Sequence, residues 1–129
     1  MIMSDKGVGA ISGASGYYLP GGGVEGMEGD EETLTRELKE ECNASIEIVH
    51  LIGRATDFLF SKAEDCHFEK RGTFYLARLL TEPDENMVWI PLPNASNLFR
   101  QPGHVWAIVQ GMRDGVADHR EPPIALRTM

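Results

Sequence analysis

Three glutamates that lie close together in the sequence, Glu37, Glu40 and Glu41, are the residues best suited to do chemistry. An α-helix turns by about 100° per residue, so all three would share one arc of a helix, beside its apolar face. Like charges at this spacing raise one another's pKa and oppose folding unless a cation neutralises them. Clustered carboxylate oxygens suit Mg²⁺ or Mn²⁺. The alternative is a solvated acidic face, with Arg36 and Lys39 as ion-pair partners.

The helix that must carry these glutamates is predicted from Asp30 to Cys42. Leu34 and Leu38 recur at helical spacing and form a buried stripe. Asp30 can cap the free N–H groups at the helix start, and the acidic residues after it suit the positive end of the helix dipole. Asn43 tolerates the left-handed conformation, so we expect it to end the helix.

A glycine-rich segment precedes this helix. The segment 17–20 runs directly into Gly21–Gly23, which predicts a tight loop. Gly21, Gly23 and Gly26 also match the spacing of a dinucleotide-binding fingerprint, but that motif needs a helix N-terminus aimed at a pyrophosphate. Here the helix begins later and its first turn is acidic, which argues against that interpretation. The sequence has no P-loop pattern, and its four histidines never pair at zinc-ligand spacing.

The loop and the helix together form one extended pattern. Gly22, Glu28 and the segment 36–41 have the spacing G-x5-E-x7-R-E-U-x-E-E, in which U is bulky and apolar. This pattern resembles the signature of the Nudix hydrolase family, and the match runs on to Ala44. Asn43 stands where the family has glycine, and Ala44 where it has a bulky apolar residue, but neither position supplies a metal ligand.

The resemblance implies a fold and an activity. The family folds as an α/β/α sandwich with a mixed β-sheet, and the wider similarity covers residues 17–112, so we expect a single domain over residues 1–129. Its members cleave the phosphoanhydride bond of a nucleoside diphosphate linked to another group, by metal-assisted attack of water on phosphorus. We therefore expect an Mg²⁺- or Mn²⁺-dependent pyrophosphohydrolase acting on a small nucleotide. A non-catalytic Nudix-like module that senses a nucleotide or mediates contacts stays open as the alternative.

The resemblance also implies roles for individual residues. The expected metal ligands are Glu37, Glu40, Glu41 and a backbone carbonyl at Gly21. The expected catalytic residues are Glu40, Glu41, Arg36 and Glu85. The expected substrate-binding residues are Gly22 and Gly23 of the loop, together with Tyr18, an aromatic residue near the loop that could stack a base, with core or partial burial of its ring as the alternative. Arg36 would orient a carboxylate through a forked hydrogen bond, and Glu28 would support the loop and the helix. The general base would be a glutamate of the signature or a carboxylate of the segment 82–86, where Glu85 is favoured.

Length, composition and charge narrow the class of protein. With 129 residues, 42% of them hydrophobic, the chain can build one domain with its own core. A net charge of -8 disfavours polymeric nucleic acid as a partner. No apolar run approaches the roughly 20 residues of a membrane span, and the first residues lack an apolar signal segment, so we expect a cytoplasmic protein. Cys42 and Cys66 are too few for a disulfide framework and are expected to be thiols.

The rest of the chain alternates strand-like and helix-like patterns. Apolar alternation predicts strands over Val8–Ser12, Ile46–Phe60, Thr73–Leu80 and Met87–Leu92. We expect Glu64–Arg71 to connect two of them as a hairpin loop, and His104–Arg113 to form a second helix. Residues 1–16, apart from the first short strand, and 114–129 are expected to be irregular. With so few strand-forming residues before the glycine loop, an edge strand would be missing or supplied by a second subunit, which favours a homodimer.

Overall fold

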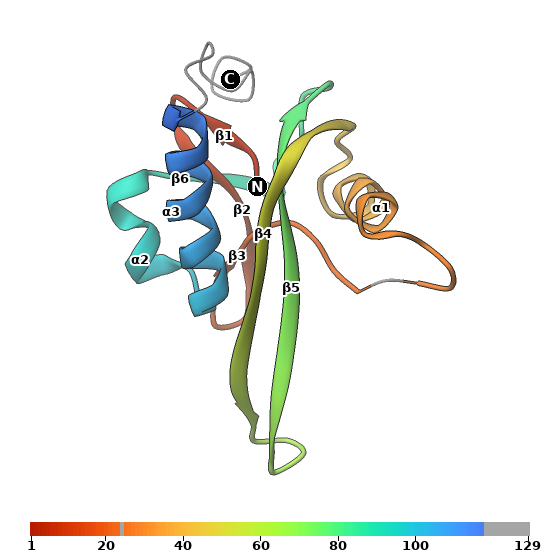
Figure 1. Ribbon diagram of the computed structural model, residues 1–129, viewed down its shortest axis with the longest axis vertical. Helices are drawn as coiled ribbons and strands as arrows, with labels where there is room; N and C mark the ends of the chain where they lie inside the picture. Colours follow the sequence, from red (N-terminus) through yellow and green to blue (C-terminus); the bar gives the residue numbers. More distant parts are fainter. Residues whose placement is uncertain (24, 118–129) are drawn as a thin grey trace.

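A computed structural model of the protein describes residues 1–23 and 25–117 (Figure 1). Its elements in chain order are β1 (Met3–Ser4), β2 (Gly7–Gly13), β3 (Gly16–Tyr18), α1 (Asp30–Cys42), β4 (Ile46–Ser61), β5 (Cys66–Leu79), β6 (Met87–Ile90), the 3₁₀ helix η1 (Leu92–Asn94), α2 (Ala95–Leu98) and α3 (Pro102–Ala117). The glutamate-bearing helix therefore has the bounds that the sequence predicts.

The strands form two antiparallel sheets that are joined at one point. β2 pairs with β1 and β3 along one edge and with β6 along the other. β4 and β5 form a long antiparallel hairpin. A parallel bridge between Ile2 and Ala77 joins the two sheets, and there the Ala77 N–H donates to the Met1 carbonyl at 2.9 Å. This parallel contact makes the whole assembly of strands mixed.

Helices cover both sides of the β4–β5 hairpin, with α1 on one side and α2 and α3 on the other (Figure 1). The core is divided accordingly into two clusters. Leu38 and Cys42 of α1 belong to one cluster, and Ala107 and Ile108 of α3 belong to the other. The architecture is the α/β/α sandwich that the sequence resemblance implies.

Residues 1–16 form strands, so the expectation of irregular structure there is wrong. Val8 is completely buried in β2. The glycines that suggest a loop in the sequence are needed because β6 packs very close: a Cβ at Gly7 would lie 2.0 Å from the Ile90 carbonyl oxygen. The segment before the glycine loop thus supplies three strands, β1, β2 and β3. Its short length does not leave the sheet without an edge strand.

Two later elements are longer than predicted. The turn between β4 and β5 is confined to residues 62–65, so most of the expected loop Glu64–Arg71 is solvent-exposed strand of β5. Pairing with β4 holds these polar residues extended. α3 begins at Pro102 and continues past Arg113 to Ala117. Residues 118–129 of the expected irregular tail lie outside the described residues.

Candidate active site

Helix α1 is terminated by residues that fix its position relative to the glycine loop. Gly29 is the N-cap, and Asp30, predicted as the cap, is the first helical residue. Asn43 ends the helix in the left-handed conformation with φ 53°, as predicted, and its N–H donates to the Lys39 carbonyl at 3.1 Å. The helix therefore starts immediately after the loop that approaches its acidic face.

Arg36 ties helix α1 to this loop. Its Nε donates to Glu28 Oε2 at 2.8 Å and its Nη2 donates to Glu28 Oε1 at 3.1 Å. Nη2 also donates to the Gly23 carbonyl at 2.9 Å. The hydrogen bonds from Arg36 are the main reason that the pKa of Glu28 falls to about 2. The forked hydrogen bond expected of Arg36 thus goes to Glu28 and holds the loop against the helix.

The same guanidinium faces two of the three glutamates. Nη1 donates to Glu37 Oε1 at 2.9 Å and to Glu40 Oε2 at 3.0 Å. The hydrogen bonds to Glu28, and then those to Glu37 and Glu40, raise the pKa of Arg36. The second oxygens, Glu37 Oε2 and Glu40 Oε1, accept no hydrogen bond from the described part of the chain. Each of these carboxylates therefore keeps one oxygen for a ligand.

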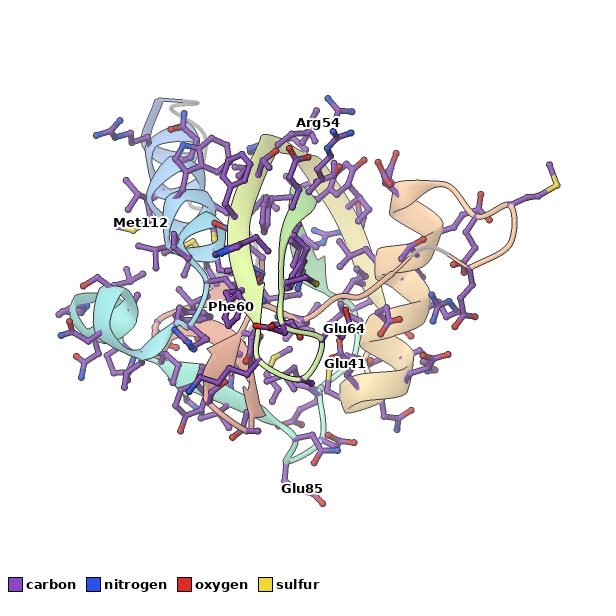
Figure 2. All side chains as sticks on the ribbon, turned by 90° about the horizontal axis from the view of Figure 1, so that it is seen from below. Glu41, Arg54, Phe60, Glu64, Glu85 and Met112 are labelled. Atoms are coloured by element: carbon purple, nitrogen blue, oxygen red, sulfur yellow. The ribbon has the colours of Figure 1, made fainter. Side chains whose placement is uncertain are left out.

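Glu41 approaches the loop from the side of α1 that faces the hairpin (Figure 2). Its Oε1 accepts a hydrogen bond from the Gly21 N–H at 2.8 Å. Burial raises the pKa of Glu41, and the nearby charges of Glu37 and Glu40 raise it further, against the effect of the Gly21 hydrogen bond. The three carboxylates therefore share one region of negative potential.

The glycines of the loop allow its backbone to reach these carboxylates. A Cβ at Gly22 would lie 2.5 Å from Glu37 Oε1, which is too close for non-bonded atoms. A Cβ at Gly23 would meet nothing within 4 Å. Gly21 has φ 151°, a conformation that other residues rarely adopt. Gly21 and Gly22 are thus both required for this close approach, for different reasons.

The donor set of this face fits a hard divalent cation, because it consists of carboxylate and carbonyl oxygens. Over residues 1–23 and 25–117, however, no three acidic, histidine or cysteine side chains lie close enough together to form a complete metal site. Arg36 and the Gly21 amide each hold glutamate oxygens that would otherwise be available. Glu40 is the most exposed of the three glutamates, with 57% of its side chain exposed, and it would have to exchange its bond to Arg36 in part for a cation.

A pocket of about 540 Å³ lies beside the acidic face. Residues 18–23 and Glu41 form one side of its lining, and residues 70–75 of β5 contribute another. Of the predicted site residues, those that line it are Tyr18, Gly21, Gly22, Gly23 and Glu41. The others are not part of its lining: Arg36, Glu37, Glu40 and Glu85. The loop and one end of the acidic face thus meet at a single cavity.

His104 is a pocket residue that the sequence analysis did not single out. Its Nδ1 accepts a hydrogen bond from the Leu19 N–H at 3.0 Å, so the neutral ring carries its proton on Nε2. The rings of Tyr18 and Phe74 stand edge-on to it, with centroid distances of 6.2 and 5.6 Å. Burial lowers the pKa of His104 to about 4. No local pattern indicates this position, because Leu19 and His104 are far apart in the sequence.

The β5 side of the pocket brings positive charge that the sequence analysis placed in a loop. Lys70 and Arg71 both line the cavity. Opposite Lys70 on β4, Asp57 accepts hydrogen bonds from the Gly103 N–H at 2.9 and 3.2 Å. This contact fixes the hairpin against the start of α3, and so fixes the position of the β5 side.

Glu85, the favoured distant base, lies in the exposed turn before β6. It points outward, away from Glu41 (Figure 2). The neighbouring Asp84 N–H donates to the Cys42 carbonyl at 2.9 Å, so the turn is held beside the end of α1. The structure therefore brings the turn near the helix without bringing Glu85 into the pocket.

A family model described as the NUDIX domain matches residues 7–101 of the chain. The chain belongs to the Nudix family. It is accordingly a hydrolase acting on phosphorus-containing anhydrides, as the signature in its sequence implies. Within the described residues, this Nudix protein has no helix both long enough and apolar enough to cross a membrane.

The fold of this Nudix protein is similar to that of two solved structures. The crystal structure of C. elegans Ap4A hydrolase is similar with a TM-score of 0.63 and 19% identity, covering 82% of this chain and 83% of that chain. The solution structure of the E. coli ORF135 protein is similar with a TM-score of 0.58 and 17% identity, covering 93% of this chain and 90% of that chain. At these identities the likeness concerns the fold. None of the curated proteins matches the chain.

Proposed function

We propose that this Nudix protein is an Mg²⁺-dependent pyrophosphohydrolase, also served by Mn²⁺, that cleaves the phosphoanhydride bond of a nucleoside diphosphate linked to another group. The observation that carries the proposal is that the acidic face of α1 meets the Gly21–Gly23 loop beside a pocket of about 540 Å³. That volume is within the range of pockets that hold small molecules. A bound divalent cation would neutralise phosphate charge and lower the pKa of the attacking water.

The residues that would hold the cation come from both sides of the loop contact. We assign this role to Glu37, Glu40, Glu41 and the Gly21 carbonyl. Arg36 acts as a positioning residue: it binds Glu37 and Glu40 through Nη1 and the loop through Nη2, and we assign it no contact with substrate. Its fixed guanidinium would keep the two carboxylates beside the loop while their second oxygens bind the cation.

The pocket residues would bind substrate and receive the proton. Gly22 and Gly23 would let the phosphates approach the loop backbone, and Tyr18 would contact the nucleoside. Water attacks one phosphorus, the bridging P–O bond breaks, and the leaving phosphate departs as the anion. Glu41 lines the pocket, so it is the carboxylate best placed to take the proton from water. Glu85 would serve as the base only if its turn moved inward.

The experiment is a hydrolysis panel with and without Mg²⁺. The panel holds nucleoside triphosphates, ADP-ribose, oxidised nucleotides and other nucleoside diphosphate conjugates, and Ap4A is added because the C. elegans neighbour is an Ap4A hydrolase. We expect Mg²⁺-dependent release of a nucleotide, lost by orders of magnitude in Glu40→Gln. Glu31→Gln, on the exposed first turn of the same helix, is the matched control and should retain activity. Binding of nucleotide without turnover by the unmodified protein would favour the sensing module instead.

The partners and compartment follow from composition and are part of the proposal. A net charge of -8 is suited to a small substrate whose charge is neutralised by a cation, and is unsuited to polymeric nucleic acid. Cys42 and Cys66 are free thiols, as the reducing cytoplasm would keep them.

A further inference from the structure

The outer part of the β4–β5 hairpin extends beyond the rest of the molecule (Figure 1). The bond between Asp57 and the Gly103 N–H is its last hydrogen bond to another element. Within the described part of the chain, no hydrogen bond or ion pair joins residues 58–69 to anything outside the hairpin. A two-stranded hairpin on its own is only marginally stable in water. This segment is therefore held extended by its own strand pairing and would be stabilised by a partner.

The same segment exposes apolar rings that water does not favour. Phe58 is 78% exposed, Phe60 49% and Phe68 42%. β4 pairs with β5 along one edge and with no described strand along its other edge. An apolar strand with a free edge is a template for pairing with another strand. The exposed rings and the free edge thus lie on one segment.

The sequence of this edge is complementary to itself when two copies run antiparallel. Residues 55–63 read Ala-Thr-Asp-Phe-Leu-Phe-Ser-Lys-Ala, so that a phenylalanine stands on each side of Leu59 and an alanine at each end. If the two-fold axis passes through Leu59, each Phe58 lies opposite Phe60 of the second copy. Asp57 then lies opposite a serine, so no like charges face one another.

Charge complementarity supports the same register. β4 ends at Ser61 and residues 62–65 form the turn, so pairing about Leu59 places the turn of one copy, which carries Glu64, beside the part of β4 of the other copy that precedes Asp57 and carries Arg54. Neither residue makes an ion pair with any described residue of its own chain. In Figure 2 Arg54 projects outward from the hairpin and Glu64 lies at its turn, so both side chains are accessible. Opposite charges from the two copies would thus flank the apolar centre at both ends.

We propose that this chain forms a two-fold symmetric dimer by antiparallel pairing of residues 57–61 of β4 with the same residues of a second copy. The two hairpins then make one four-stranded sheet, and Phe58 and Phe60 of both copies share one face, whereas Phe68 lies on the other face with its partner Leu59. This surface is distinct from the N-terminal edge on which a homodimer is expected from the sequence. The inference does not depend on the proposed hydrolase activity, because the state of association is measured without substrate.

The first experiment uses two double variants that differ at one position. Phe58→Glu/Phe60→Glu places two acidic side chains opposite each other at both ends of the pairing, and Phe58→Glu/Phe60→Lys places opposite charges there. In both variants the glutamate introduced at position 58 lies opposite Glu69 of the same hairpin. Repulsion between these two carboxylates within one chain is therefore equal in the two variants and does not affect the comparison. Analytical ultracentrifugation should show the unmodified chain and the second variant as dimers and the first as a monomer. Circular dichroism checks that both are folded.

The second experiment tests the register directly. Leu59→Cys, in a Cys66→Ser background, should form a covalent dimer on mild oxidation, because residues facing each other across the axis have Cβ atoms about 5 Å apart. Thr56→Cys is the control, since the two copies of that position would be separated by about 20 Å along the strands. Cys42 is buried and does not interfere.

Three results would overturn the proposal. The first is an unmodified chain that stays monomeric up to about 1 mM, the range of the weakest specific binding. The second is a dimer that survives equally in both double variants, which would place the interface elsewhere. The third is cross-linking of Thr56→Cys in preference to Leu59→Cys, which would exclude the register.

Discussion

Glu41 accepts a hydrogen bond from the Gly21 amide at 2.8 Å, so the last glutamate of the acidic face closes the glycine loop onto the helix. The bond holds a half-buried carboxylate beside Glu37 and Glu40, where burial and like charge both raise its pKa. Such an arrangement costs stability and is retained where the charge has a function. The proposed cation would remove that cost.

Glu41→Gln should separate stability from activity. The amide oxygen of glutamine can still accept the Gly21 hydrogen bond, but the variant buries no charge. We expect a higher melting temperature than that of the unmodified protein in EDTA, together with a loss of hydrolysis by orders of magnitude. Thermal unfolding and turnover at neutral pH measure the two effects. A variant with unchanged turnover would show that Glu41 neither binds the cation nor accepts the proton.

Gly22→Ala should weaken cation binding through Glu37. The added methyl group would lie 2.5 Å from Glu37 Oε1, so the carboxylate must move away from the loop. We expect at least a tenfold loss of Mn²⁺ affinity, measured by electron paramagnetic resonance, and a parallel loss of turnover. Gly23→Ala adds the same group where nothing lies within 4 Å and should leave the affinity unchanged. Equal behaviour of the two variants would remove Glu37 from the proposed ligands.

Arg36→Met should abolish one component of acid denaturation. The folded-state pKa of Glu28 is about 2 and its ordinary value is 4.5, so the ion pair stabilises the fold fully above pH 4.5 and this stability is lost as the pH falls toward 2. Urea unfolding at several pH values should show that loss in the unmodified protein and a flatter profile in Arg36→Met. Lys39→Met, on the same helix, removes an ammonium that donates to the Ser45 hydroxyl and pairs with no carboxylate of the described residues, and it should keep the unmodified profile. A steep profile in all three proteins would mean that other carboxylates dominate.

The helix and the loop were predictable because their signals are local. Leu34, Leu38 and Asn43 encode the length and the buried face of α1 within a few residues of one another, and the structure agrees. The role of Gly7 was not predictable in this way. Glycine in a sequence indicates a loop, but here it lies in a strand and permits the close packing of β6. A glycine's role depends on what packs against it, and a single sequence does not contain that information.

The pocket could be predicted only on its loop side for the same reason. Tyr18 and the glycines are part of the recognisable pattern, whereas Lys70 reaches the cavity because β5 is extended through a stretch that looks like a polar turn. Long-range pairing with β4 overrides the local preference there. Glu85 shows the limit of analogy, since a carboxylate at a suitable place in the sequence points away from the site (Figure 2).

His104 should make the protein lose stability in mildly acidic solution. Its folded-state pKa is about 4 against an ordinary value of 6.5, so the unfolded chain binds the proton first as the pH falls. The contribution of His104 to stability is therefore constant above pH 6.5 and decreases between pH 6.5 and about 4, by roughly 3 kcal/mol in total. Below pH 4.5 the Glu28 pair contributes as well, and burial lowers the pKa of the Met1 ammonium from 8.0 to about 5, so that group contributes between pH 8 and 5. The effect of the histidine is therefore measured by urea unfolding between pH 6.5 and 5 as the difference from a variant that lacks it.

The matched variant is His104→Asn, whose side-chain oxygen can still accept the Leu19 N–H but which does not titrate. Between pH 6.5 and 5 it should lose less stability than the unmodified protein, because it keeps the slope from the Met1 ammonium and lacks the slope from the histidine. His67→Asn, at an exposed position of the hairpin, should keep the slope of the unmodified protein. A slope in His104→Asn equal to that of the unmodified protein would mean that the ring is not held neutral by its burial against Tyr18 and Phe74.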